Sequence, residues 1–181
     1  MYWKRRQTRR NNSAAATWKL GLVFCAILLP VCTPAVIDKV RDLQDRFDKE
    51  THAGNKVKAL QKLGDAQFEA AGKAGQAEDF ITVGLTFEKY RDNVRSTLDL
   101  LKKQEPDADR HPGGYRQLEL QARKGIREVE DALLTAPPEV RPPLEIVHKD
   151  MLDMDDELIR LLFPRRTPDP QKVPPAPEEK L

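Results

Sequence analysis

From Val36 to Leu161 the apolar residues of this chain recur every three or four positions, and no stretch alternates convincingly with a period of two. A spacing of three and four follows one face of an α-helix, which makes a turn in about 3.6 residues. A half-buried β-strand would instead place an apolar residue at every second position. The pattern therefore predicts an all-α protein.

Interruptions in this pattern divide the region into five predicted helices, at about 36–50, 56–74, 76–104, 115–135 and 143–163. The third is the longest and would extend roughly 40 Å at 1.5 Å per residue. The fifth has the most regular apolar seam, which consists of Leu144, Val147, Met151, Met154, Leu158 and Leu161. Because short connections make successive helices antiparallel, we expect an elongated up-and-down bundle of four to five helices, spanning 36–163.

Glycine and proline set several of the predicted boundaries. Gly72 and Gly75 are expected to weaken the end of the second helix. Pro137-Pro138 and Pro142-Pro143 are expected to bracket a stiff connector before the fifth helix, because proline lacks the amide that a continuous helix needs. Six prolines and many charges predict a disordered tail at 164–181.

Between residues 63 and 80 the chain has Leu63-Gly64, then Phe68 and Ala71, and later Phe80. This pattern resembles a piece of a tetratricopeptide helical hairpin. A second copy about 34 residues later would begin near Thr97, where the glycine and alanine positions of that repeat are not occupied. One such unit cannot bury its own apolar face. We therefore interpret this stretch as ordinary packing within a helical hairpin.

The N-terminal 35 residues have the features of a targeting segment. They contain six basic residues and no acidic one, and the basic region is followed by an apolar run at 20–31. This run is short for a membrane span of about 20 residues, and Thr33-Pro34-Ala35 supplies the small residues that a signal peptidase recognises. We predict a signal peptide at 1–35, with an uncleaved membrane anchor at 20–37 as the alternative. In both cases the remainder is exported, to the periplasm or outside the cell.

Charge and cysteine content restrict what the exported part can do. Beyond residue 35 the chain has 25 basic and 29 acidic residues, so its basic isoelectric point comes from the N-terminal segment. We therefore expect no binding to nucleic acid, which requires positive charge on the folded surface. Cys25 and Cys32 both lie in the predicted leader, so the domain has no internal disulfide, thiolate metal site or cysteine nucleophile.

The segment DADRHPGGYR, residues 107–116, concentrates the residues that could do chemistry. Asp107, Asp109 and His111 alternate like the ligands of a divalent cation. A calcium loop of the EF-hand type beginning at Asp107 would need glycine at its sixth position and glutamate at its twelfth, where this chain has Pro112 and Leu118. Metal binding is therefore a secondary hypothesis, and we predict no cofactor.

We interpret residues 107–116 first as the turn between the third and fourth helices. Either Pro112-Gly113 forms the centre of a type II turn, or His111 caps the fourth helix and Pro112 is its first residue. Exposed amides at a helix start, close to positive side chains, can also hold an anion. The residues we predict for such a site are Arg110, His111, Gly113, Gly114 and Arg116.

An acidic run on the predicted fifth helix consists of Asp150, Asp153, Asp155, Asp156 and Glu157. Asp156 lies opposite the apolar seam and the others flank it, so we interpret the run as a solvated surface rather than a catalytic pair. His148 is expected at the edge of the same seam. Since the sequence contains neither a recognisable Ser/His/Asp arrangement nor a phosphate-binding glycine loop, we predict no enzymatic activity.

The sequence favours an exported, non-enzymatic helical-bundle protein that acts as a structural or protein-interaction module in the cell envelope or outside the cell. Its partner would be an envelope or extracellular protein or a second copy of the chain. Contact with a membrane is expected only through an uncleaved N-terminal segment. The alternative function is binding of a small anion or a divalent metal by residues 107–116.

Tryptophan fluorescence tests the predicted processing, because Trp3 and Trp18 both lie in the predicted leader. Exported protein that has been cleaved after Ala35 is expected to show tyrosine emission and no tryptophan emission. The measurement is an emission spectrum of the purified exported protein, excited where only tryptophan absorbs. Persistent tryptophan emission would show that the segment is retained as an anchor.

Overall fold

The computed structural model describes residues 34–164 of the 181-residue chain. The chain divides into two units, 1–31 and 32–181, and the described residues all belong to the second. Within them the chain is helical and forms no strand, which confirms the predicted all-α class. The helices are α1 Pro34–Lys49, α2 Ala53–Gln76, α3 Phe80–Gln104, α4 Pro112–Thr135, the short 3-10 helix η1 Pro138–Val140, and α5 Arg141–Leu162. The predicted leader and the proline-rich tail fall almost wholly outside the described residues.

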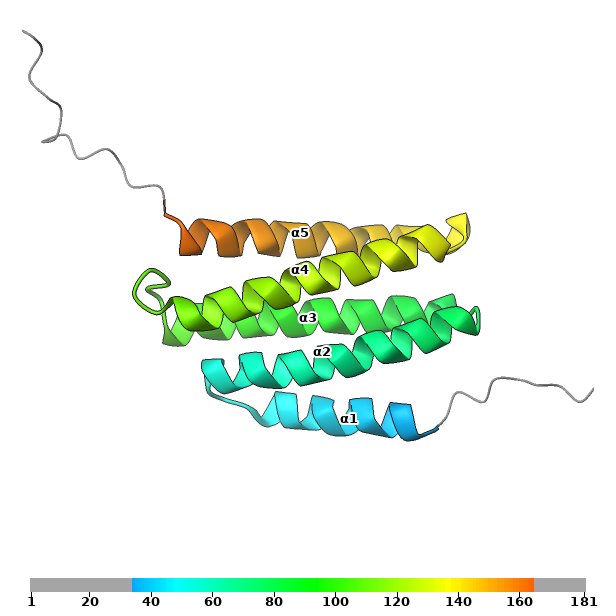
Figure 1. The fold of residues 1–181 in the computed structure, drawn as a ribbon, viewed down its shortest axis with the longest axis horizontal. Coiled ribbons are helices and arrows are strands. Elements are labelled where there is room, and N and C mark those ends of the chain that lie inside the picture. Colours follow the sequence, from blue (N-terminus) through cyan, green and yellow to red (C-terminus); the bar gives the residue numbers. More distant parts are fainter. Residues whose placement is uncertain (1–33, 165–181) are drawn as a thin grey trace, which may run out of the picture. The chain divides into compact units, whose positions relative to one another are not determined.

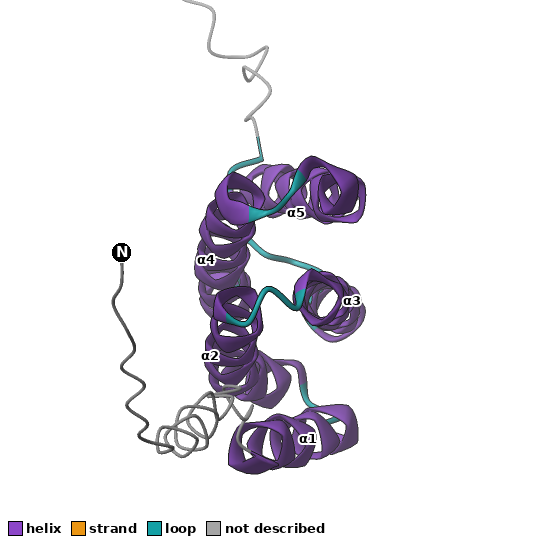
Figure 2. Ribbon diagram, turned by 90° about the vertical axis from the view of Figure 1, so that its right-hand side faces the viewer, coloured by secondary structure: helices purple, strands orange, loops and turns teal. Residues whose placement is uncertain are grey.

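Successive α-helices run antiparallel, as the short connections predict (Figure 1). They alternate between two layers: α2 and α4 form one layer, and α1, α3 and α5 form the other (Figure 2). The central helix is α3, which packs on α2, α4 and α5. The two helices α2 and α4 also contact each other directly. The up-and-down bundle is thus a two-layer array in which α3 lies beneath the seam between α2 and α4.

The core lies between the layers and uses the predicted apolar seams. On α3 the buried seam residues are Val83, Phe87, Tyr90, Val94, Leu98 and Leu101. On α5 the seam ends at buried Leu162 rather than at the predicted Leu161, which is only partly buried. The reason is that Leu162 lies about five full turns from Leu144 in a helix of 3.6 residues per turn, whereas a strict seven-residue repeat selects Leu161.

The junction between α2 and α3 differs from the prediction. The helix α2 continues through Gly72 and Gly75, and α3 begins at Phe80 rather than at residue 76. The start of α3 is fixed by Asp79, whose carboxylate accepts hydrogen bonds from the backbone N of Thr82 at 3.1 Å and from its hydroxyl at 2.6 Å. This capping satisfies an amide that the first turn would otherwise leave without a partner.

Prolines begin both α4 and α5. Pro112 is the first residue of α4 and His111 is its N-cap, so the second of the two predicted turn geometries is correct. The type II turn is wrong, because Gly113 lies inside the helix and has no positive φ. Likewise Pro142-Pro143 lie in the first turn of α5, which begins at Arg141, and not in the connector. A proline costs nothing at these positions, since the first amides of a helix have no intrahelical acceptor.

The helix α1 packs on α2 and makes no comparable backbone contact with the other described helices. One amide pair joins its side chains to α3: Gln44 Nε2 donates to Asn93 Oδ1 at 3.2 Å, and Asn93 Nδ2 donates to Gln44 Oε1 at 3.0 Å. One turn farther along α1, buried Lys56 of α2 donates to the carbonyl of Phe47 at 3.2 Å and lies over the Phe47 ring. These contacts attach α1 as an outer helix of its layer.

Tyr90 of α3 lies where α2, α3 and α4 meet. Two glycines face opposite edges of its ring. A Cβ atom at Gly64 of α2 would lie 2.8 Å from Tyr90 Cε2, and one at Gly125 of α4 would overlap Tyr90 Cε1 and lie 2.9 Å from Met151 Cε. The fully buried hydroxyl donates a hydrogen bond of 2.7 Å to the carbonyl of Gln121 on α4. The phenol ring therefore determines how closely α2 and α4 approach α3.

Gly125→Ala is expected to destabilise the protein by about 1–3 kcal/mol, because the new methyl group overpacks against Tyr90. The loss should appear although alanine favours a helix over glycine by about 1 kcal/mol. Gly113→Ala in the same helix is the matched control, since its Cβ would meet nothing within 4 Å. Urea unfolding of both variants measures the effect. If Gly125→Ala were as stable as Gly113→Ala, the ring would not be a steric limit.

Candidate functional site

The predicted loop at 107–116 connects α3 to α4 and satisfies its own polar groups. The Asp107 carboxylate accepts a hydrogen bond from the backbone N of Arg110 at 3.2 Å and pairs with Arg110 Nε at 3.1 Å. The Asp107 carbonyl accepts from the backbone N of His111 at 3.0 Å. The structure thus pairs Asp107 with Arg110 as part of a local turn, and Asp109, His111, Gly113 and Arg116 are exposed around it.

Two residues of this loop hold α4 against the end of α3. A Cβ at Gly114 would lie 2.7 Å from Leu101 Cδ2, so the two helices approach closely there. The fully buried Tyr115 donates its hydroxyl to the carbonyl of Glu105 at 2.8 Å, and burial raises the pKa of the Tyr115 phenol. Gly114 and Tyr115 therefore have a packing role, which their position in the sequence did not reveal, whereas Gly113 is exposed and has open space around it.

Metal and anion binding by the 107–116 loop stay predictions. In the region from residue 34 to 164, no group of three or more His, Cys, Asp and Glu side chains is arranged to hold a metal ion. The side chain of His111 makes no capping hydrogen bond to α4. The geometry at the start of α4 thus gives neither hypothesis further support.

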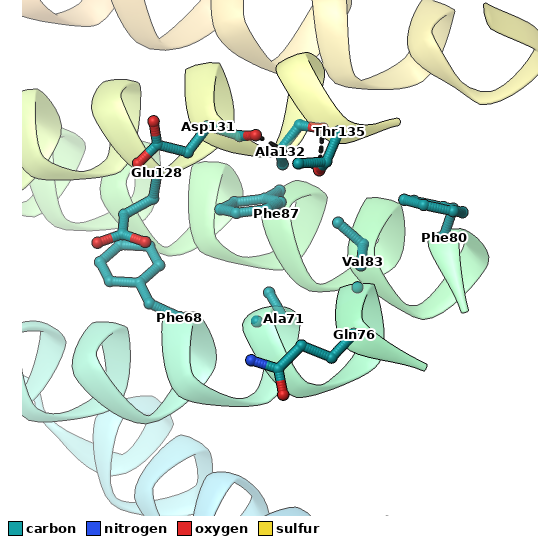
Figure 3. Close-up of a pocket in the computed structure, with 12 residues that line it drawn as sticks. Phe68, Ala71, Gln76, Phe80, Val83, Phe87, Glu128, Asp131, Ala132 and Thr135 are labelled. Atoms are coloured by element: carbon teal, nitrogen blue, oxygen red, sulfur yellow. Dashed lines mark hydrogen bonds between the residues drawn. The ribbon is translucent and has the colours of Figure 1, made fainter. Parts of the chain in front are cut away.

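A groove of about 370 Å³ lies between α2 and α4, and residues of α3 form part of its floor (Figure 3). Its apolar floor includes Phe68 of α2 together with Val83 and Phe87 of α3. The Phe68 ring also contacts Tyr90, at 4.7 Å between ring centroids, so the groove begins next to the ring that separates the helices. Phe80, which is partly buried, lies at the opposite end of the floor, near the start of α3 (Figure 3).

The α2 wall of the groove is low. It is formed by Ala71, Gly72, Gly75 and Gln76, so no side chain larger than a methyl group stands on it before Gln76. A Cβ at Gly72 would meet nothing within 4 Å, and one at Gly75 would meet only Val83 Cγ2, at 3.9 Å. This wall therefore leaves room for a group that enters from solvent.

The α4 wall is acidic. Glu128 and Asp131 line it, and Glu128 extends from α4 toward the side of the groove where Phe68 lies (Figure 3). In the described part of the chain neither carboxylate forms an ion pair, whereas the neighbouring Lys124 pairs with Asp65 of α2 at 2.7 Å. That pair bridges the two walls and bounds one end of the groove.

The acidic run of α5 differs in part from the predicted solvated face. Asp153 and Asp156 are exposed as expected. However, Asp150 pairs with Arg91 of α3 at 3.2 Å and with Arg95 at 3.6 Å, and Glu157 pairs with Lys102 of α3 at 2.7 Å. The reason is that α5 contacts both α3 and α4, so both flanks of its seam face a neighbouring helix. His148 lies at the edge of the seam as predicted, 3.0 Å from Glu130 Oε1.

Asp155 is the least exposed carboxylate in this run. Its side chain is 13% exposed, and its Oδ1 has no hydrogen-bond partner among the described residues. Arg123 Nε lies 3.7 Å from this oxygen but only 2.5 Å from Glu119 Oε1, so the cation is engaged mainly by the other carboxylate. Burial raises the pKa of Asp155; Arg123 opposes the shift, and the nearby charge of Glu119 adds to it.

Comparison of the chain with protein-family models, with curated proteins and with solved structures finds no match in any of the three. Function therefore has to be inferred from the residues of this chain. Among the described features, the groove between α2 and α4 joins an apolar floor to two carboxylates that form no ion pair. The sequence pattern did not reveal it, because its floor and walls come from three helices.

Asp155→Asn is expected to stabilise the protein by about 1 kcal/mol near neutral pH. Burial raises the pKa of Asp155 in the folded state, so the wild-type chain loses stability as the pH rises through that pKa, and the amide avoids this loss. The advantage should disappear at a pH where the carboxyl is protonated in both states. Urea unfolding across pH measures it, with Asp153→Asn at an exposed site as the control. Equal stability of both variants near pH 7 would contradict the assignment.

Proposed function

We propose that this protein is an exported, non-enzymatic protein-interaction module that holds its partner in the groove between α2 and α4. The observation that carries the proposal is the groove itself, with its apolar floor, its low α2 wall and its two carboxylates on α4. A volume of about 370 Å³ lies in the usual range of binding sites, roughly 300–1,000 Å³, and accommodates several side chains of a partner.

The chemistry of the groove favours binding over catalysis. Its titratable lining residues are Glu128 and Asp131, both on one wall, and no histidine, lysine, serine or cysteine of the described residues lines it. The remaining hydroxyl, that of Thr135, donates to backbone carbonyls of its own helix, those of Asp131 and Ala132. A nucleophile next to a base, which covalent catalysis requires, is therefore not assembled there.

Two exposed apolar side chains are next in sequence to residues that line the groove. Ile81, which follows Phe80 on α3, is 74% exposed, and Leu134, which precedes Thr135 on α4, is 80% exposed. Large apolar groups left in water near a groove are typical of surfaces that another protein covers.

The proposed location depends on the N-terminal sequence. Six basic residues followed by the apolar run 20–31 and Thr33-Pro34-Ala35 favour export, with an envelope or extracellular protein, or a second copy of the chain, as the partner. No helix within residues 34–164 has the length and apolar character needed to cross a membrane.

Site-specific photo-crosslinking tests the proposal. A photo-reactive residue that replaces Gln76, which lines the groove and is exposed, is expected to crosslink a discrete partner when the full-length chain is expressed in its native cells. The same residue at Gln61, exposed on α2 about four turns earlier, is the matched control and should not capture that partner. Gly72→Leu, which fills the groove from its low wall, should abolish the Gln76 crosslink. Capture that is equal at both positions, or that persists with Gly72→Leu, would exclude the groove as the binding site.

A further inference from the structure

We infer that the groove binds a basic amphipathic helix of a partner protein, which places apolar side chains on the floor between Phe68 and Phe80 and lysine or arginine side chains beside Glu128 and Asp131. The inference rests on the proposed function and specifies the chemistry of the partner. The apolar floor matches the apolar face of such a helix, and the two carboxylates of the α4 wall match its basic face.

The residues that line the α4 wall include no cation; Arg127, which precedes Glu128 on α4, is exposed and is not part of the lining. On α2 the cation nearest the low wall, Lys73, pairs with Glu69 at 2.8 Å, and on α4 Lys124 pairs with Asp65. The first turns of α3 add no basic residue and begin with the capping carboxylate of Asp79. The charged side chains that line the groove are thus both carboxylates, which a cationic partner would neutralise.

The spacing of the two acids favours a helical partner. Glu128 and Asp131 are separated by three residues on α4, and side chains at that spacing lie about 5–6 Å apart on one face of a helix. A partner helix presents cations at the same separation when Lys or Arg residues are three or four positions apart. Its apolar residues then recur on the adjacent face, which is how amphipathic helices occupy hydrophobic grooves.

The dimensions of the groove agree with a short helical segment. On α2 the lining extends from Phe68 to Gln76, about 12 Å along the helix axis, or a little more than two turns. The Lys124–Asp65 pair bounds the end next to Phe68, while partly buried Phe80 remains accessible near the start of α3. A helix that lies along this length can place two apolar anchors on the floor and two cations on the α4 wall.

A pair of synthetic helices tests the inference. The probe is the leucine-lysine peptide LKKLLKLLKKLLKL, and its counterpart has glutamate at every lysine position; both carry fluorescein. Binding to the full-length chain is measured by fluorescence anisotropy. The lysine peptide is expected to bind at least about tenfold more tightly than the glutamate peptide, and Glu128→Gln/Asp131→Gln should weaken its binding by about tenfold or more.

Matched variants separate a local effect from a change in net charge or fold. Glu145→Gln/Asp153→Gln removes the same two charges at exposed sites of α5 and should leave the affinity within about twofold. Gly72→Leu should block the peptide, whereas Gly54→Leu, at the other end of α2 and also without a neighbour within 4 Å of its Cβ, should not. If the lysine peptide bound all four variants as tightly as the wild type, the inference would be wrong.

The outcomes distinguish failure of the inference from failure of the proposed function. Weak binding of the lysine peptide, together with a Gln76-specific crosslink in cells, would overturn the basic-helix inference and leave the interaction module standing. Absence of both signals would overturn both. A wild-type dimer in sedimentation that Gly72→Leu converts to a monomer would identify a second copy as the occupant, and would also overturn the inference.

Discussion

The position of the Tyr90 ring between Gly64 and Gly125 is the contact on which the rest of the structure depends. It allows two helices of one layer to lie close together over α3, and its hydroxyl bonds to the carbonyl of Gln121 on α4. Burial raises the pKa of this phenol, so the hydroxyl keeps its proton and remains a donor at physiological pH. Farther along the two helices, between Phe68 and Gln76 of α2 and between Glu128 and Thr135 of α4, the space over α3 forms the groove.

Much of the fold could be predicted from the sequence because burial in a helical protein repeats along the chain. The seam from Val83 to Leu101 is buried as its spacing predicts, and the boundaries of α1, α3 and α4 at their C-terminal ends lie within one residue of the prediction. The errors in helix boundaries occur where the low helix propensity of glycine competes with other local signals, such as a capping side chain. Gly72 and Gly75 were expected to weaken the end of a helix at about residue 74, but α2 continues to Gln76, and Asp79 caps the start of α3.

The candidate site was predictable to a much smaller extent. Residues 107–116 were predicted as the site because ligand-like side chains are close together there. In the structure, Asp107 and Arg110 instead form a hydrogen bond and an ion pair with each other within one turn. The groove combines Phe68, Val83 and Glu128 from three helices that are distant in sequence. A single sequence shows which face each residue occupies on its own helix, but not which faces of different helices meet across a layer. The sequence showed the small residues of the α2 wall, but they predicted only a weak helix end and not one wall of a groove.

The attachment of α1 has a mechanical consequence. By backbone packing α1 touches only α2, and the Gln44–Asn93 amide pair is its side-chain link to α3. A pulling force that entered the chain at its N-terminal side would therefore load the α1–α2 interface first, while the groove, built from α2, α3 and α4, lies farther along the load path. Under such a force α1 would separate from α2 before α2, α3 and α4 are pulled apart.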